Sequence, residues 1–113
     1  MHSGFTSADP VIDTDGAPVA APLISSIRRV DSAEQIGASI RGTTDGPLAV
    51  RLQVSPDDSA GSYRTVDEDV LNGADTGAEL RFESFQIFAR ITIEAVGAGA
   101  GTQFTGKAYL MTR

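Results

Sequence analysis

The chain has 113 residues, which is enough for a single domain, and 41% of them are hydrophobic. Its formal net charge is −6, and this acidic balance argues against a protein that neutralises nucleic-acid phosphates or docks on an anionic membrane. Without Cys there is no disulfide scaffold, thiol catalysis or Cys-ligated metal, and a single His, His2, supports neither a catalytic triad nor a multi-His site. Composition therefore predicts a protein that is not an enzyme, has no cofactor and binds neither nucleic acid nor membrane.

The first 22 residues differ in character from the rest. They contain three prolines and no hydrophobic period, so we expect an extended N-terminal arm over residues 1–22 and a β domain over residues 23–113. The arm lacks the basic start and apolar stretch of a secretory signal, which predicts synthesis in the cytoplasm without a signal peptide. Its apolar residues are predicted to be buried on a neighbouring subunit, and these are Phe5, Val11, Ile12 and Val19.

Two further expectations follow from this division. An exposed sheet edge is expected to add a second contact between subunits by strand addition. Deleting residues 1–20 is expected to abolish assembly and to leave the β domain folded.

From residue 23 the sequence alternates between apolar and polar residues, as half-buried strands do. The clearest runs cover residues 36–41 and 48–54, and the turn-forming residues 44–47 between them predict a hairpin. Further extended segments are expected at 63–66, 79–83, 85–95 and 104–111, and residues 23–30 suit either a strand or a short helical turn. The pattern predicts an all-β fold, an antiparallel β-sandwich (jelly-roll-like or Ig-like) of about six to eight strands.

Acidic residues gather between residues 57 and 83, where eight carboxylates and two arginines account for the whole net charge of −6. Loop carboxylates are the ligands that hard cations prefer, so Asp57, Asp67 and Asp69 are the weak candidates for a metal site. A solvated acidic face, or one that meets a basic neighbour, is the favoured alternative. Two aromatic residues are possible ligand contacts, Tyr63 beside a loop and Tyr109.

Two other acidic patterns do not support a functional assignment. Asp13-Thr14-Asp15-Gly16 matches the middle of an EF-hand loop, but Pro22 stands where the loop needs a Glu. Pairs of carboxylates for glycoside hydrolysis need a defined separation in space, which sequence spacing does not provide.

The stretch Arg51-Leu52-Gln53-Val54-Ser55-Pro56-Asp57, followed by Tyr63-Arg64-Thr65-Val66-Asp67 and a long strand over residues 85–95, resembles small β-sandwich virion structural proteins of tailed phages and archaeal tailed viruses. The resemblance covers residues 48–111 and implies a capsid decoration, turret or tail component located in the virion. It also implies a homo-oligomer whose partners are itself and other virion proteins. A halophilic or GC-rich source would suit the basic residues, eight of which are Arg and one Lys.

Three classes of function therefore remain in view. The first is the non-enzymatic virion structural protein, acting by homo-oligomeric assembly and arm-mediated contacts. The alternative is a ligand- or host-surface-binding β-sandwich module of the carbohydrate or adhesion type. A small enzyme is the third and has the least support in the sequence.

Overall fold

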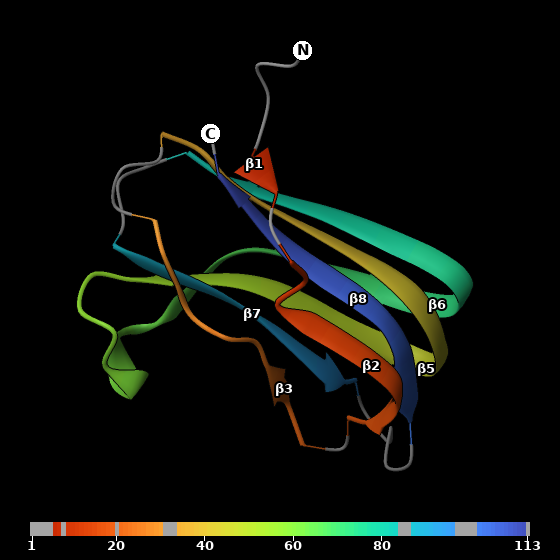
Figure 1. The fold of residues 1–113 in the computed structure, drawn as a ribbon. Coiled ribbons are helices and arrows are strands. Elements are labelled where there is room, and N and C mark those ends of the chain that lie inside the picture. The colour runs from red at the N-terminus through yellow and green to blue at the C-terminus, as the bar shows by residue number, and fades with distance from the viewer. Residues whose placement is uncertain are drawn as a thin grey trace.

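A computed structural model describes residues 6–7, 9–19, 21–30, 34–83, 87–96 and 102–112, with backbone only at 6–7 (Figure 1). These residues form one antiparallel sheet of eight strands: β1 (Thr6–Ser7), β2 (Ile12–Pro18), β3 (Leu23–Ile24), β4 (Arg28–Arg29), β5 (Ile36–Ser55), β6 (Arg64–Phe82), β7 (Phe88–Ala95) and β8 (Gln103–Thr112). The short 3-10 turn η1 (Ala60–Ser62) is the one helical element in these ranges, and no described helix has the length and apolarity to cross a membrane. The predicted all-β antiparallel fold is confirmed.

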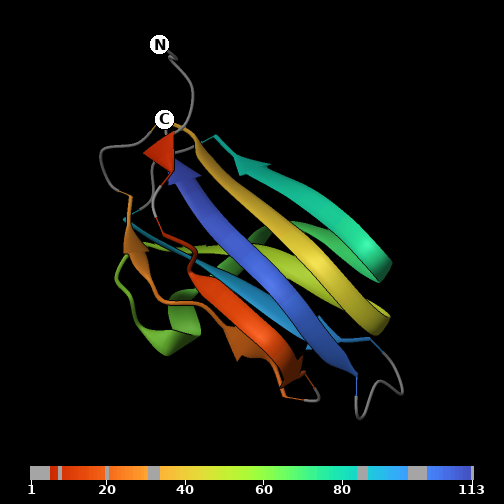
Figure 2. The same ribbon diagram turned by 45° about the vertical axis from the view of Figure 1, so that its right-hand side comes forward.

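The sheet curls over on itself because its two longest strands take part in both halves. Residues 36–44 of β5 pair with β8, whereas residues 48–55 pair with β7. β6 runs along the other side of β5 over both stretches. β1 and β2 pair with β8 at one side, and β3 and β4 pair with β7 at the other. The result is a strongly curled half-barrel whose halves face each other across one core (Figures 1 and 2).

The predicted hairpin at residues 44–47 is wrong, because these residues lie inside the continuous strand β5. The register to β6 shifts between Thr44 and Leu48, which identifies an irregularity rather than a reversal. The Thr44 hydroxyl donates to the Gly46 carbonyl at 2.6 Å, and the Asp45 carboxylate accepts the Gln103 backbone N–H at 2.8 Å. Turn-forming residues here bend a strand from one half of the sheet into the other, a role that bulges also have in barrels.

The segments expected at 63–66 and 79–83 are likewise parts of one strand. β6 is continuous over 19 residues, so Asp67 and Asp69 lie in a strand and not in a loop. By contrast, residues 23–30 behave as predicted in their extended form, since β3 and β4 both pair with β7. The expected strand at 85–95 corresponds to β7, and Phe85 lies outside the described residues.

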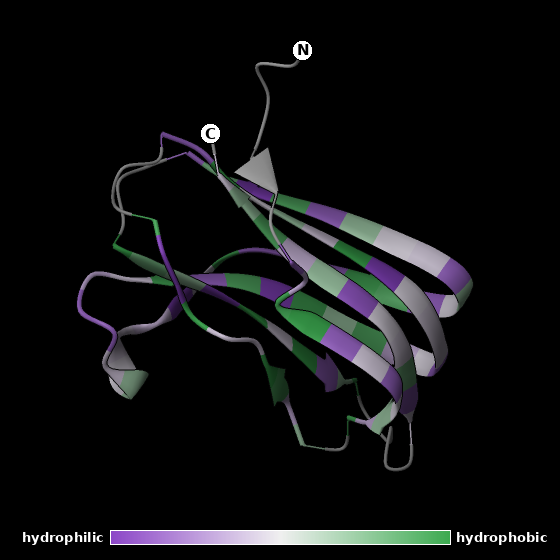
Figure 3. Ribbon diagram, viewed as in Figure 1, coloured by the Kyte–Doolittle hydropathy of each residue, from purple (hydrophilic) through white to green (hydrophobic). Residues whose placement is uncertain are grey.

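The alternation read from the sequence matches the burial in the fold. Over most of β5 and β7 every second residue is buried, and many of the residues between are more exposed. Figure 3 shows hydrophobic and hydrophilic residues mixed along the strands. The fully buried side chains predicted for the core include Ile36, Ala38, Ile40, Leu48, Val50, Leu52, Val54, Ile91 and Ile93. The outward faces of the two halves therefore carry most of the polar side chains of these two strands.

The structure differs from the predicted N-terminal arm in where residues 12–18 lie. Residues 12–18 are extended as expected, but they form β2 and pair with β8 of the same chain. Ile12 and Val19 are buried in the common core, at 7% and 0% exposure, and Val11 packs against it. The prediction that these residues are buried on a neighbouring subunit is therefore wrong for Ile12 and Val19, whereas Phe5 lies outside the described residues.

Candidate functional site

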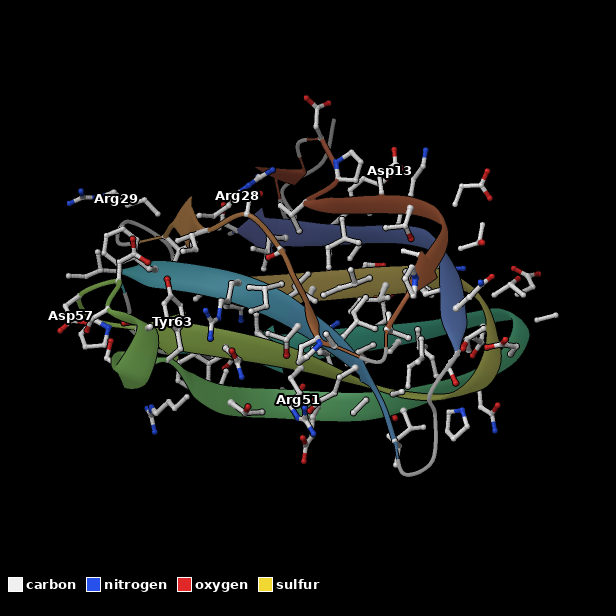
Figure 4. The ribbon with its side chains drawn as sticks, turned by 90° about the horizontal axis from the view of Figure 1, so that it is seen from below. Asp13, Arg28, Arg29, Arg51, Asp57 and Tyr63 are labelled. Carbon is white, nitrogen blue, oxygen red and sulfur yellow. The ribbon has the colours of Figure 1, made fainter. Side chains whose placement is uncertain are left out.

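The candidate site is a group of connected polar side chains on the outward face of one half of the sheet. This half is formed by β7, residues 48–55 of β5 and the start of β6. Leu52 and Val54 of β5 point into the core, so Gln53 between them points outward, and Arg90 of β7 stands opposite Gln53 in the register. Tyr63 follows η1 and precedes β6 (Figure 4), and its ring lies against Arg90. We call Gln53, Tyr63, Thr65 and Arg90 the Tyr63–Arg90 platform.

The residues of the platform are connected by one cation–π contact and two hydrogen bonds. The Arg90 guanidinium carbon lies 4.0 Å from the centroid of the Tyr63 ring, which is a close cation–π contact. Arg90 Nε donates to the Gln53 side-chain oxygen at 2.9 Å, and Gln53 Nε2 donates to the Thr65 hydroxyl at 3.2 Å. The guanidinium is therefore held over the Tyr63 ring and fixed at Nε by the Gln53 amide.

The loop before Tyr63 is held by serine hydroxyls around one carboxylate. The Asp57 carboxylate accepts hydrogen bonds from the side chains of Ser62, Ser59 and Ser55 and from the backbone N–H of Ser59. These bonds, those from Ser62 and Ser59 first, hold the pKa of Asp57 well below its ordinary value of 3.8. Asp57 therefore stays charged and organises the loop that presents Tyr63.

Asp58 fixes the Tyr63 ring from the other end. The Tyr63 hydroxyl donates to Asp58 Oδ1 at 2.7 Å, and Asp58 adopts a left-handed backbone with φ of 58°. Burial and then the Asp58 carboxylate raise the pKa of Tyr63 to about 12. The hydroxyl is thus protonated at all ordinary pH values, and any stability it adds is present below about pH 10 and lost as pH rises towards 12.

A second cation–aromatic pair borders the platform. The Arg29 guanidinium carbon of β4 lies 5.9 Å from the centroid of the Phe88 ring, and Phe88 precedes Arg90 by two residues on the same outward face. Figure 4 shows Arg29, Tyr63 and Asp57 at the same end of the sheet. This end therefore combines two arginines with two aromatic rings in an otherwise acidic protein.

The neighbouring arginine on this face, Arg51, has a different environment. Its Nε lies 3.0 Å from Glu68, and its Nη1 bonds to Glu94. The hydrogen bond that Arg51 donates to Glu94 is the main cause of the raised pKa of Arg51. Arg51 therefore belongs to a three-residue ion-pair network that neutralises its charge.

The predicted cation ligands do not come together. Asp57 serves the loop described above, whereas Asp67 and Asp69 lie along β6, which pairs only with β5 in the described part of the chain. Within those same ranges no group of three or more His, Asp or Glu residues is arranged to hold a metal ion. Asp13 and Asp15, from the EF-hand-like pattern, lie in β2.

The carboxylates of Asp67 and Asp69 instead accept hydrogen bonds from backbone N–H groups of their own strand, β6, which lies at an edge of the sheet. Asp67 accepts the N–H of Glu68 at 3.0 Å and that of Arg81 at 2.9 Å, and Asp69 accepts the N–H of Val70 at 2.7 Å. Because Asp67 bonds to Arg81, it also links the two ends of β6, which belong to opposite halves of the sheet. The acidic side chains here oppose the addition of another strand at β6.

The two tyrosines singled out in the sequence are on different surfaces. Tyr63 belongs to the platform, whereas Tyr109 lies in β8 opposite Ser39, on the outward face of the other half. Alternation does place Gln53 and Arg90 on polar faces, but the contact between them depends on the pairing of β5 with β7. The sequence contains no signal for that register.

No protein-family model matches the sequence, and no curated protein sequence matches it either. Among solved structures, the crystal structure of PirA is similar with a TM-score of 0.55 and 18% identity, covering 81% of this chain and 82% of that chain. The CBM36-1 domain of a multidomain xylanase from the hindgut metagenome of Trinervitermes trinervoides is similar with a TM-score of 0.48 and 12% identity, covering 100% of this chain and 88% of the domain. The likeness to PirA shows a shared fold and carries over no residue role.

Proposed function

We propose that this chain is a non-enzymatic ligand-binding β-module that recognises a glycan through the Tyr63–Arg90 platform. The observation that carries the proposal is the fixed stack of Arg90 on Tyr63, supported by Gln53 at one edge and by the Asp57 loop beside it. A planar guanidinium, an aromatic ring, an amide and the Thr65 hydroxyl on one face of the sheet suit a ligand rich in hydroxyl groups. Their prior fixation lowers the entropy cost of binding.

The test is affinity electrophoresis in gels that contain polygalacturonate, methyl-esterified pectin, xylan or heparin. We expect at least one of these polymers to retard the protein, and Tyr63→Ala to weaken that binding about tenfold or more, because a central aromatic anchor is lost. Tyr109→Ala is the matched control, since it removes the same side chain from the other half of the sheet. Tyr63→Phe keeps the ring and removes only the bond to Asp58, so it should retain most of the affinity.

Two results would contradict this function. One is a wild-type protein that none of the four polymers retards. The other is equal loss of retardation in Tyr63→Ala and Tyr109→Ala, with both variants folded by circular dichroism. Either result removes the platform as the binding site.

The reading as a virion structural protein that assembles with itself and with other virion proteins remains a prediction. Its main support was an arm in need of a neighbour, and the pairing of β2 with β8 now accounts for the order of residues 12–18 without one. Light scattering on the purified protein tests it directly. A defined ring or trimer would favour assembly, and a monomer would oppose it.

A further inference from the structure

Arg90 carries a charge that the described part of the protein does not neutralise. Its Nε bonds to a neutral amide, that of Gln53, and its face rests on the Tyr63 ring. No carboxylate in the described ranges forms an ion pair with it, and its terminal nitrogens Nη1 and Nη2 have no hydrogen-bond acceptor there. Arg51, one row of residues away on the same face, has two carboxylates.

The two unused nitrogens form a fork in a fixed plane. Because Nε and the ring already set the orientation of the guanidinium, a ligand does not have to order a mobile side chain before it binds. Two parallel N–H groups match the two oxygens of a carboxylate, and such charge-assisted pairs are stronger than neutral hydrogen bonds. The arrangement is therefore that of an anion-recognition group with no anion of its own.

The surrounding charges favour an anionic group with one negative charge over an anionic group with two. The chain has a net charge of −6, and Asp57 and Asp58 stand in the loop beside the platform. A phosphate dianion would meet more repulsion from these groups than a carboxylate would. A planar, single negative charge fits both the fork and its neighbours.

We propose that Arg90 binds the carboxylate of an acidic sugar, a uronic acid, in the glycan that the platform recognises. This inference rests on the proposed function and adds the ligand class to it. Gln53 and Tyr63 act as positioning residues for Arg90, because they hold its guanidinium in place.

The test compares two probes with one backbone, oligogalacturonate and its methyl ester, by isothermal titration calorimetry. The wild-type protein should bind the acid about tenfold or more tightly than the ester, as expected for a charged, bidentate hydrogen bond. Arg90→Gln should bind both probes equally. Arg90→Lys keeps the charge but loses the fork, so it should recover only a minor part of the preference.

Arg51→Gln is the matched control, because it removes the same charge from the same face. Its guanidinium is already paired with Glu68 and Glu94, so the preference for the acid should persist. Loss of the preference in this variant, equal to the loss in Arg90→Gln, would show a general charge effect and overturn the inference.

The remaining outcomes separate this inference from the function on which it rests. Equal binding of acid and ester by the wild type would overturn the carboxylate assignment and leave the glycan-binding function standing. Binding of an acidic peptide such as tetraglutamate in preference to both sugars would overturn both. Binding of none of these probes by the wild type would overturn the carboxylate assignment.

Discussion

Arg51 and Arg90 stand on the same outward face, one row of residues apart, yet the fold treats their charges in opposite ways. Arg51 stands opposite Glu68 of β6 and near Glu94 of β7, and it bonds to both. Arg90 stands opposite Gln53 and is covered by Tyr63, which are both neutral. Arg51 is paired with carboxylates of the sheet, whereas Arg90 contacts only uncharged side chains among the described residues.

This difference shows that strand register decides what a surface arginine does. Glu68 and Glu94 reach Arg51 because they lie on the strands that flank β5 at that row. A shift of β7 by one residue would move Arg90 to the core face and Ile91 to the surface. Residue type supplies the charge, and pairing supplies its partner.

The largest effect is expected from a polar substitution in the core beneath both arginines. Leu52 is fully buried on β5 between Arg51 and Gln53, so Leu52→Asp should cost more than about 4 kcal/mol of unfolding free energy and leave the protein unfolded. Circular dichroism and thermal melting measure this. Val70→Asp, at a hydrophobic position that is 55% exposed on the neighbouring strand β6, is the control and should melt close to the wild type.

Deleting residues 1–20 is the next largest change. It removes β2 and the buried side chains of Ile12 and Val19, so we expect a loss of several kcal/mol, in contrast to the expectation from sequence alone. Thermal melting of the truncated chain gives the answer. A truncated chain that melts like the full one would show that β2 adds little to the sheet.

The edge of β6 offers a test of what Asp67 and Asp69 do for the sheet. Changing Asp67 and Asp69 together to Val frees the backbone N–H groups of Glu68, Val70 and Arg81, and should increase self-association through added strands. Light scattering over a concentration series measures it.

The matched control for the edge is the double change to Asn. It removes the same two charges but keeps an acceptor oxygen at each position. We expect it to associate no more than the wild type. If it associates as strongly as the Val variant, net charge and not the occupied donors protects the edge.

Acid pH should weaken the loop beside Arg90, because this loop is organised around the Asp57 carboxylate. The fold lowers the pKa of Asp57, so the stability that this carboxylate adds is present above the ordinary value of 3.8 and is lost as pH falls below it. The difference in melting temperature between the wild type and Asp57→Asn should therefore shrink between pH 5 and about pH 2. A difference that stays constant over this range would mean that Asp57 does not hold the loop through its charge.

The smallest effect is expected from the ion pairs of Arg51. Glu68 and Glu94 are 61% and 36% exposed, so Arg51→Gln should cost about 1 kcal/mol or less. Chemical denaturation measures this, and added salt should reduce the difference further. A loss of several kcal/mol would place Arg51 among the residues that hold the sheet together.

Much of the fold follows from the alternation of apolar and polar residues along the strands, but this alternation does not show which strands pair. The buried faces of residues 36–40, 48–54 and 89–93 are predicted correctly, because a period of two assigns each side chain to one face whatever the strand pairs with. The hairpin at 44–47 was wrong because Asp, Gly and Pro serve a bulge as well as a reversal. For the site, Tyr63 was found by its place beside a loop, whereas its contact with Arg90 was not.

By itself, the sequence determined the fold class, the core faces of the main strands and the lack of any cysteine chemistry. These depend on residue type and local period, which act without knowledge of distant segments. Only the tertiary structure decided that β2 joins the sheet, that Asp67 and Asp69 occupy the edge of β6, and that Arg90 stacks on Tyr63. Each of these features involves residues 14 or more positions apart or depends on which strands are neighbours. Pairing between distant strands is set by how the whole sheet closes on its core.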